Sequence, residues 1–240
     1  MVAVRDKHAV VLGGSSGIGY AIAQACIEGG ARVTVGSRDP ARTAAAARTL
    51  GTGARGVEVD ATDRESLGRF FAEAGPVDHL VLSISSGGGT GLFRDLDLEA
   101  LRRAIDGKLW ACVNAMQLAL PHLSRSGSIT VISGGAARAA MPATSGLAAS
   151  NGALNAMVPT LAVELAPIRV NVVCPGIVTT PIFERWSDAV RELMTQRAQA
   201  APVGRAGRPD EVARVVMLLL ENEYLTGSII DADGGMHLRP

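Results

Sequence analysis

Short apolar runs alternate along this chain with longer stretches in which apolar side chains recur at helical spacing. The short runs predict strands over His8–Leu12, Arg32–Val35, Gly56–Val59, Asp78–Ile84, Ser128–Ser133, Arg169–Cys174 and Ser228–Asp231. The longer stretches predict helices over Ser16–Glu28, Pro40–Leu50, Arg64–Ala74, Leu98–Leu123, Gly146–Leu165, Ala189–Gln199 and Asp210–Leu220. This alternation indicates an α/β fold, a doubly wound parallel sheet with helices on both faces.

No linker, repeat or low-complexity tract interrupts the alternation. A chain of 240 residues, nearly half of them apolar, is long enough to bury one sizeable core. We therefore expect a single domain over residues 1–240.

The composition argues against several classes of partner and site. The formal net charge is zero, which argues against nucleic acid or an anionic membrane surface as a partner. The three cysteines and four histidines are scattered, so neither a disulfide framework nor a metal site is indicated. The first residues lack the long apolar core of a signal peptide, and no uncharged apolar run reaches membrane-spanning length. We expect a cytoplasmic protein that acts on a small molecule.

The first strand is followed by the glycine-rich sequence G-G-S-S-G-I-G. Glycines allow a sharp turn and let a pyrophosphate approach the helix N-terminus, where free N–H groups favour anions. A glycine pattern alone is weak, but this one lies between a strand and a helix, as dinucleotide binding requires. The predicted cofactor contacts are Gly13, Ser15, Ser16, Gly17, Ile18 and Gly19; the alternative is a tight turn without a ligand.

The end of the second strand favours one cofactor over another. A carboxylate there would accept hydrogen bonds from the ribose of NAD, whereas an arginine can hold the 2′-phosphate of NADP. The sequence has Ser37 and Arg38, and the nearest acid, Asp39, comes after them. We expect NADP(H), unless Arg38 simply lies on a surface loop.

With these motifs the chain resembles the short-chain dehydrogenase/reductase family over essentially its whole length. V-E-V-D-A-T-D is similar to the family's adenine-side segment, and R-V-N-V-V-C-P-G-I-V-T-T-P to the segment that holds the nicotinamide. G-R-P-D-E-V-A and Y-L-T-G-S-I-I-D-A-D-G-G resemble its final helix and strand. The resemblance implies a Rossmann-type fold and further cofactor contacts at Asp60, Ala61, Ser83, Pro175, Gly176, Val178 and Thr180.

The family's usual catalytic set is absent. The resemblance places the catalytic serine at Gly134, the tyrosine at Leu147, the lysine at Asn151 and the helix asparagine at Lys108. The chain has two tyrosines, and neither has a lysine four residues on. The proton chemistry that the resemblance would imply is therefore missing.

Lys108 is the candidate replacement. It lies on an apolar stripe of its predicted helix with Leu101, Ile105, Cys112 and Ala115, where burial would lower the pKa of an ammonium. The resemblance places it below the nicotinamide. Our hypothesis is that Lys108 supplies positive charge, and a proton where one is needed, with Ser133 and Asn151 as hydrogen-bonding support. The alternative is that Lys108 binds backbone carbonyls or an acid and does no chemistry.

Our main hypothesis is that the protein is an NADP(H)-dependent oxidoreductase with a non-standard site, suited to an iminium or another activated electrophile. The segment from about 182 to 205, with Arg185, Trp186, Met194 and Arg197, resembles the family's substrate lid and permits an apolar substrate, including one with an anionic group. The alternative reading is a catalytically silent NADP(H)-binding sensor or partner subunit; a purely structural subunit is a third. The resemblance also implies a homodimer or homotetramer, assembled through the two long helices.

Overall fold

A seven-stranded parallel sheet forms the centre of the molecule. The computed structural model describes residues 4–85 and 87–238, whose strands lie in the order β3-β2-β1-β4-β5-β6-β7. Every neighbouring pair is parallel. The strands are β1 (His8–Leu12), β2 (Arg32–Ser37), β3 (Ala54–Glu58), β4 (Val77–Leu82), β5 (Leu123–Ile132), β6 (Arg169–Pro175) and β7 (Ile229–Ala232).

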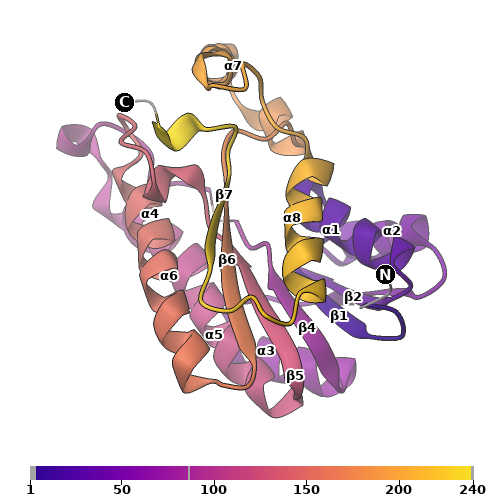
Figure 1. The fold of residues 1–240 in the computed structure, drawn as a ribbon. Coiled ribbons are helices and arrows are strands. Elements are labelled where there is room, and N and C mark those ends of the chain that lie inside the picture. Colours follow the sequence, from indigo (N-terminus) through magenta and orange to yellow (C-terminus); the bar gives the residue numbers. More distant parts are fainter. Residues whose placement is uncertain (1–3, 86, 239–240) are drawn as a thin grey trace.

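Helices cover both faces of this sheet (Figure 1). One face carries α1 (Gly17–Glu28), α2 (Pro40–Leu50) and α8 (Pro209–Glu221); the other carries α3 (Arg64–Ala74), α4 (Leu98–Ile105), α5 (Ala111–Ala119) and α6 (Ser145–Glu164). Successive strand residues point to opposite faces, so Val10 and Leu12 pack with α3, α5 and α6, whereas Ala9 and Val11 pack with α1 and α8. The predicted α/β class and doubly wound sheet are confirmed.

The direction of winding changes between β1 and β4. The chain runs outward through β2 and β3, then returns to place β4 on the other side of β1. In open α/β sheets, ligands bind at the carboxyl ends of the strands beside this change of direction. Helix α7 (Asp188–Ala200) lies at the same end, apart from the two helical layers (Figure 1).

The helix predicted over Leu98–Leu123 is present as a continuous helical run, but it is not α-helical throughout and it ends before Leu123. α4 ends at Ile105, a π-helical turn spans Asp106–Trp110, and α5 ends at Ala119. Pro121 then lies in a 3₁₀ turn, where its missing N–H breaks no α-helical bond, and Leu123 already begins β5. The π turn contains Lys108, and such turns are frequent at functional sites.

Other predicted elements are present with shifted ends. β3 begins and ends earlier than Gly56–Val59, and β4 ends before Ser83 and Ile84. The pattern missed short 3₁₀ turns at Phe93–Asp95, Gly135–Ala137, Pro181–Arg185 and Met236–Leu238, because three to five residues carry no periodicity. Lys7 is part of the folded domain, since its ammonium pairs with Asp78 at 3.6 Å.

The buried guanidinium of Arg169 joins β6 to α8. It donates to the backbone oxygens of Leu219 at 2.6 Å, Leu220 at 3.0 Å and Leu225 at 3.1 Å. These bonds pair carbonyls near the C-terminal end of α8, which its own ladder cannot satisfy. Asn171 adds a bond from Nδ2 to Leu225 O at 2.9 Å. The polar residues of R-V-N thus hold α8 against the sheet.

Candidate functional site

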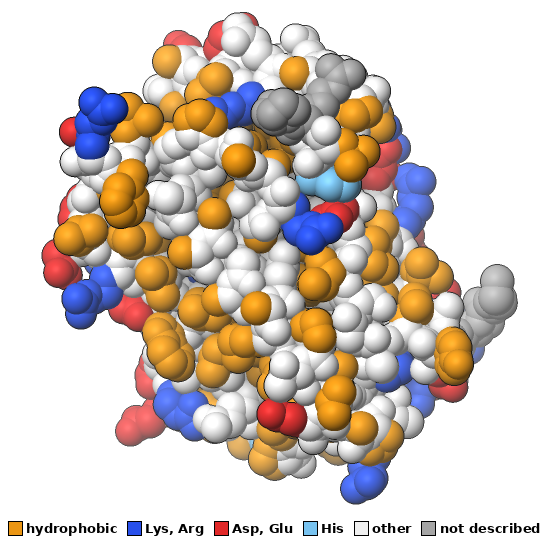
Figure 2. Space-filling model, turned by 60° about the vertical axis from the view of Figure 1, so that its left-hand side comes forward, with side chains coloured by type: hydrophobic (Ala, Val, Ile, Leu, Met, Phe, Trp, Pro, Cys, Tyr) orange, Lys and Arg blue, Asp and Glu red, His pale blue; other side chains and the backbone are white. Residues whose placement is uncertain are grey.

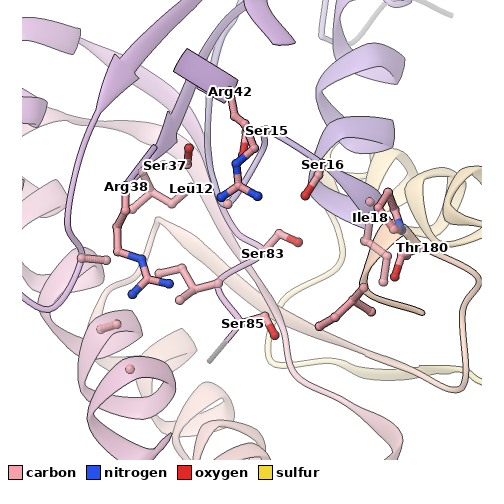
Figure 3. A pocket seen from close by; sticks show the side chains of 18 of the residues that line it. Leu12, Ser15, Ser16, Ile18, Ser37, Arg38, Arg42, Ser83, Ser85 and Thr180 are labelled. Carbon is pink, nitrogen blue, oxygen red and sulfur yellow. The ribbon is translucent and has the colours of Figure 1, made fainter. Parts of the chain in front are cut away.

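A cleft of about 460 Å³ opens at the carboxyl ends of the strands. Its wall includes Leu12 at the end of β1, Ser37 at the end of β2, Ser83 after β4 and Gly176 after β6. Figure 3 shows these walls with Ser15 and Ser16 above Ser83 and with Thr180 beside Ile18. The strand ends on both sides of the β1–β4 boundary therefore contribute to one site.

Three glycine positions in the turn after β1 leave little room for a Cβ. A Cβ at Gly13, which has φ of +80°, would lie 2.3 Å from Ser83 O, and one at Gly19 would lie 2.2 Å from Gly13 O. Gly17 has φ of +56°, and its Cβ would lie 3.2 Å from Thr180 Cγ2. Gly19 is absent from the cleft wall because its role is this close packing of helix on turn.

The N-terminus of α1 is open to an anion. Ser16 is its N-cap residue, and within the described chain Ser16 makes no side-chain capping bond and the first turn has no acid. The first N–H groups of a helix need acceptors, and the helix dipole makes their surroundings positive. This turn fits the pyrophosphate of a dinucleotide.

Two arginines lie at the β2 end of the cleft. Arg38 and Arg42 both line it, and Figure 3 shows both side chains on the Ser37 side of the pocket, with their guanidinium groups at separate places. Asp39 caps α2, accepting from Arg42 N at 3.0 Å, and its carboxylate pairs with Arg42 Nε at 2.9 Å. The hydrogen bond from Arg42 N, followed by the nearby guanidinium, lowers the pKa of Asp39. Sequence reasoning missed Arg42, although its position one helical turn after Arg38 was a usable signal.

The β3 end of the cleft carries Asp60, Ala61 and Thr62. The Asp60 carboxylate accepts from Thr62 N at 2.9 Å and from Thr62 Oγ1 at 2.7 Å, so its orientation is fixed. The predicted contacts Asp60 and Ala61 thus lie together with Ser37 and Arg38, while Thr62 was not singled out.

The segment after β6 closes the opposite end. Gly176, Val178 and Thr180 line the cleft, whereas Pro175 belongs to β6 and is absent from the wall. A Cβ at Gly176 would lie 2.8 Å from Asp233 Cα, which explains glycine here. Ile182, Phe183 and Trp186 continue the wall into the predicted lid.

The three predicted catalytic residues lie beneath this wall. Gly107 and Ala111, which precede and follow Lys108 in the sequence, line the cleft. Lys108, Ser133 and Asn151 are not among the described residues that line it. Lys108 Nζ donates to Ile84 O and to Ile132 O, each at 2.6 Å. These carbonyls lie at the carboxyl ends of β4 and β5, so the ammonium joins two strand ends. Burial of the ammonium lowers the pKa of Lys108.

Ser133 and Asn151 have different surroundings. Ser133 Oγ lies 3.2 Å from Cys174 Sγ. A Cβ placed at Gly134 would lie 2.9 Å from Asn151 Nδ2. Within the described structure, the buried Oδ1 of Asn151 has no hydrogen-bond partner. A serine at Gly134, where the resemblance expects one, would require the end of the Asn151 side chain to shift.

A sheet with a glycine turn and a dinucleotide-sized cleft at its winding change defines the class of dinucleotide-binding α/β proteins. Within that class, the chain belongs to the short-chain dehydrogenase/reductase family. A family model described as enoyl-(acyl carrier protein) reductase matches residues 13–237. The chain is 31% identical to short-chain dehydrogenase/reductase ATR9 of Stachybotrys chlorohalonatus over 100% of both chains. It is 33% identical to cis-4-hydroxycyclohexanecarboxylate dehydrogenase of Sinomonas cyclohexanicum, over 97% of each.

Solved structures agree. A small-chain dehydrogenase in complex with NADPH is 34% identical, with a TM-score of 0.85, over 98% of this chain and 100% of that one. The MalC reductase/Diels-Alderase from Malbranchea aurantiaca is 25% identical, with a TM-score of 0.89, over 98% and 97%. The relatives are thus oxidoreductases, and one of the similar structures was solved with the nicotinamide cofactor NADPH.

The described residues contain no helix that is both long enough and apolar enough to span a bilayer. They also contain no group of three or more His, Cys, Asp or Glu side chains placed to hold a metal ion.

Proposed function

We propose that this protein is an NADP(H)-dependent oxidoreductase that reduces an iminium or another activated C=N or C=O group. The observation that carries the proposal is the contrast between the two parts of the site. The cleft retains the glycine turn, the open α1 N-terminus and two arginines, while Leu147 and Asn151 stand where the family has tyrosine and lysine. The relative solved with NADPH supports the choice of cofactor.

The residues of the cleft have separate tasks in binding. Gly13 to Ile18 and the α1 N-terminus bind the pyrophosphate, and Arg38 with Arg42 bind the 2′-phosphate. Asp60 and Ala61 lie beside the adenosine, while Ser83, Gly176, Val178 and Thr180 hold the nicotinamide end. A bound nicotinamide supplies the hydride.

The protein's own contribution to the chemistry is electrostatic. An iminium carries its positive charge in the ground state, so hydride transfer yields a neutral amine without a strong acid beside the reacting atom. Lys108 holds the β4 and β5 ends in place and contributes positive charge where a carbonyl oxygen would become negative. Ser133 and Asn151 support it as hydrogen-bonding groups. The two carbonyls that accept from Lys108 offset part of its charge, which lets a cationic substrate approach.

The test begins with binding. The purified protein is titrated with NADPH and separately with NADH, and the cofactor fluorescence is followed. The proposal requires much tighter binding of NADPH, followed by NADPH consumption with cyclic imines or activated ketones. Equal affinity for both cofactors would remove the role given to the arginines, and no binding of either would remove the oxidoreductase assignment.

A second candidate is a silent NADP(H)-binding sensor or partner subunit. One observation favours it: two protons of the Lys108 ammonium are already donated to backbone carbonyls, and Lys108 is not part of the described cleft wall. Tight NADPH binding without turnover of any imine or ketone, combined with NADPH-dependent affinity for another protein, would favour this function over the first.

We also propose self-association through the α4–α5 and α6 face. Leu98, Trp110 and Val163 are more than half exposed there. Figure 2 shows hydrophobic side chains spread over this side of the molecule, with most charged groups near its margin. A second copy presenting the same face would cover them, giving a homodimer or homotetramer. Light scattering tests this, and a monomer at micromolar concentration would contradict it.

A further inference from the structure

Two aromatic side chains lie together at the lid end of the cleft. The rings of Phe183 and Trp186 have centroids 4.5 Å apart and an interplanar angle of 39°. Both residues line the cleft, together with Ile182. The chain has four phenylalanines, two tryptophans and two tyrosines, so an aromatic pair at one site is a large share of its aromatic surface.

The backbone fixes this pair relative to the cofactor end of the cleft. Phe183 N donates to Thr180 O at 3.0 Å, and Trp186 N donates to Phe183 O at 3.2 Å. Arg191 Nη1 of α7 donates to Trp186 O at 3.1 Å. Thr180 in turn packs against Gly17 of the glycine turn. The aromatic pair is therefore tied both to the cofactor-binding turn and to the lid helix.

Local packing alone does not explain an aromatic pair in this position. Phe70 and Phe71, whose rings also contact each other, are buried in the core with 1% and 0% exposure. Phe183 and Trp186 are both half-buried, and each keeps surface toward the cleft. Rings that face a cleft can contact a ligand ring edge-to-face or by stacking.

The described residues that line the lid end of the cleft, Ile182, Phe183 and Trp186, are uncharged. Among the described residues that line the cleft, the charged ones are Arg38, Arg42 and Asp60, all at the ends of β2 and β3. Glu184, on the same turn as Phe183, is exposed and is not on that wall. The described part of this end therefore offers a ligand apolar surface and rings; the Arg185 side chain lies outside the described residues.

We propose that Phe183 and Trp186 form a ring-binding subsite that selects substrates whose reacting group is fused or conjugated to a planar apolar ring. The inference rests on the proposed function for the reaction but names its substrate class. The substrate ring lies against the aromatic pair, and its reacting carbon points to the nicotinamide end near Gly176. Small aliphatic imines and ketones lack this contact and bind weakly.

Binding of two matched amines tests the subsite without requiring turnover. 1,2,3,4-Tetrahydroisoquinoline and piperidine are both secondary ammonium ions at neutral pH and differ by one fused benzene ring. Calorimetric titration is done on the NADPH-saturated protein and on the cofactor-free protein. We expect tetrahydroisoquinoline to bind at least about tenfold more tightly, a difference of about 1.4 kcal/mol. Equal affinities in both forms of the protein would overturn the proposal.

Variants assign the preference to the pair. Phe183→Ala and Trp186→Ala should each reduce the ratio of affinities to less than about threefold, while Trp186→Phe should keep most of it. Leu193→Ala is the matched control, because Leu193 is an exposed apolar residue of the same lid and is absent from the described cleft wall. An undiminished preference in both alanine variants would also overturn the proposal.

Failure of the proposed function has a different signature. If the ring-dependent binding is present but NADPH does not reduce 3,4-dihydroisoquinoline, the subsite stands and the reductase assignment falls. If 3,4-dihydroisoquinoline and 1-pyrroline are reduced with equal kcat/KM and the two amines bind equally, the reductase assignment stands and the subsite falls.

Discussion

At the scale of single residues, the cofactor end and the catalytic end of the site differ in kind. Arg38, Arg42 and Asp60 point into the cleft and are placed to touch a ligand. Lys108 instead satisfies two backbone carbonyls, and Asn151 fills space beside Gly134. In the function proposed above, the first group selects the cofactor, and the second supports the walls of the cleft.

Arg42 should discriminate between the two cofactors. In Arg42→Ala the 2′-phosphate loses a guanidinium partner and meets an unpaired Asp39 carboxylate, so NADPH affinity should fall about tenfold. NADH affinity should hardly change. Arg48→Ala is the control, since Arg48 is exposed at the other end of α2. Equal losses for both cofactors would show that Arg42 supports the fold instead.

Lys108 should matter for stability whether or not it takes part in the reaction. Lys108→Met leaves Ile84 O and Ile132 O without their donor, which should lower the free energy of unfolding by about 2–4 kcal/mol. Lys7→Met, which removes an exposed ion pair, should cost less than about 1 kcal/mol. Denaturant unfolding measures both.

The kinetics of the same variant distinguish a purely structural role of Lys108 from an electrostatic role in the reaction. If Lys108 contributes charge to the reaction, Lys108→Met should lose turnover while its NADPH affinity stays intact at a temperature where it is folded. Unchanged kcat in the folded variant would rule out that contribution.

At the scale of elements, the polar side chains at helix ends decide how layers join. The π turn at Asp106–Trp110 places Lys108 between β4 and β5, and Arg169, the first residue of β6, binds carbonyls near the C-terminal end of α8. In both cases one buried cation connects a helical element to the sheet through backbone oxygens. The Lys108 contact lies at the carboxyl ends of the strands and supports the wall of the cleft, whereas the Arg169 contact lies at the other end of the sheet and holds α8.

Arg169 offers a direct test. Arg169→Met leaves the oxygens of Leu219, Leu220 and Leu225 short of donors and should cost about 2–4 kcal/mol of unfolding free energy. Arg214→Met, on an exposed face of α8, should be nearly neutral. Amide hydrogen exchange should show the loss first at the end of α8; protection retained there would contradict the role given to Arg169.

At the scale of the whole molecule, the sheet's central strands bury titratable groups that resist protonation. His79 on β4 is buried, and burial lowers its pKa to about 4. Its Nδ1 shares a hydrogen bond with Ser128 Oγ at 2.9 Å, and within the described structure its Nε2 has no partner. A proton on this ring would add an unpaired charge to the core.

The stability of the fold should therefore fall in mild acid. The unfolded chain takes up a proton at His79 below its ordinary pKa of about 6.5, whereas the folded chain does so only near 4, so the unfolding free energy should decrease between those values. The ceiling is about 3 kcal/mol, at about 1.4 kcal/mol per pH unit. In His79→Asn, which keeps a polar group for Ser128, the loss between pH 7 and pH 5 should be smaller. An identical acid dependence would assign the effect to other groups.

The sequence by itself determined the class of fold and the place of the glycine turn, and it predicted that the family's usual catalytic residues are replaced. Strand and helix periods are local, and a glycine turn is required wherever a Cβ would meet backbone, as at Gly13 and Gly19. Only the tertiary structure decided that Lys108 joins two strand ends, that Arg42 shares the cleft with Arg38, and that Phe183 and Trp186 meet. Those facts depend on which distant elements lie side by side and on the π turn and 3₁₀ turns between them, where short-range patterns carry no signal.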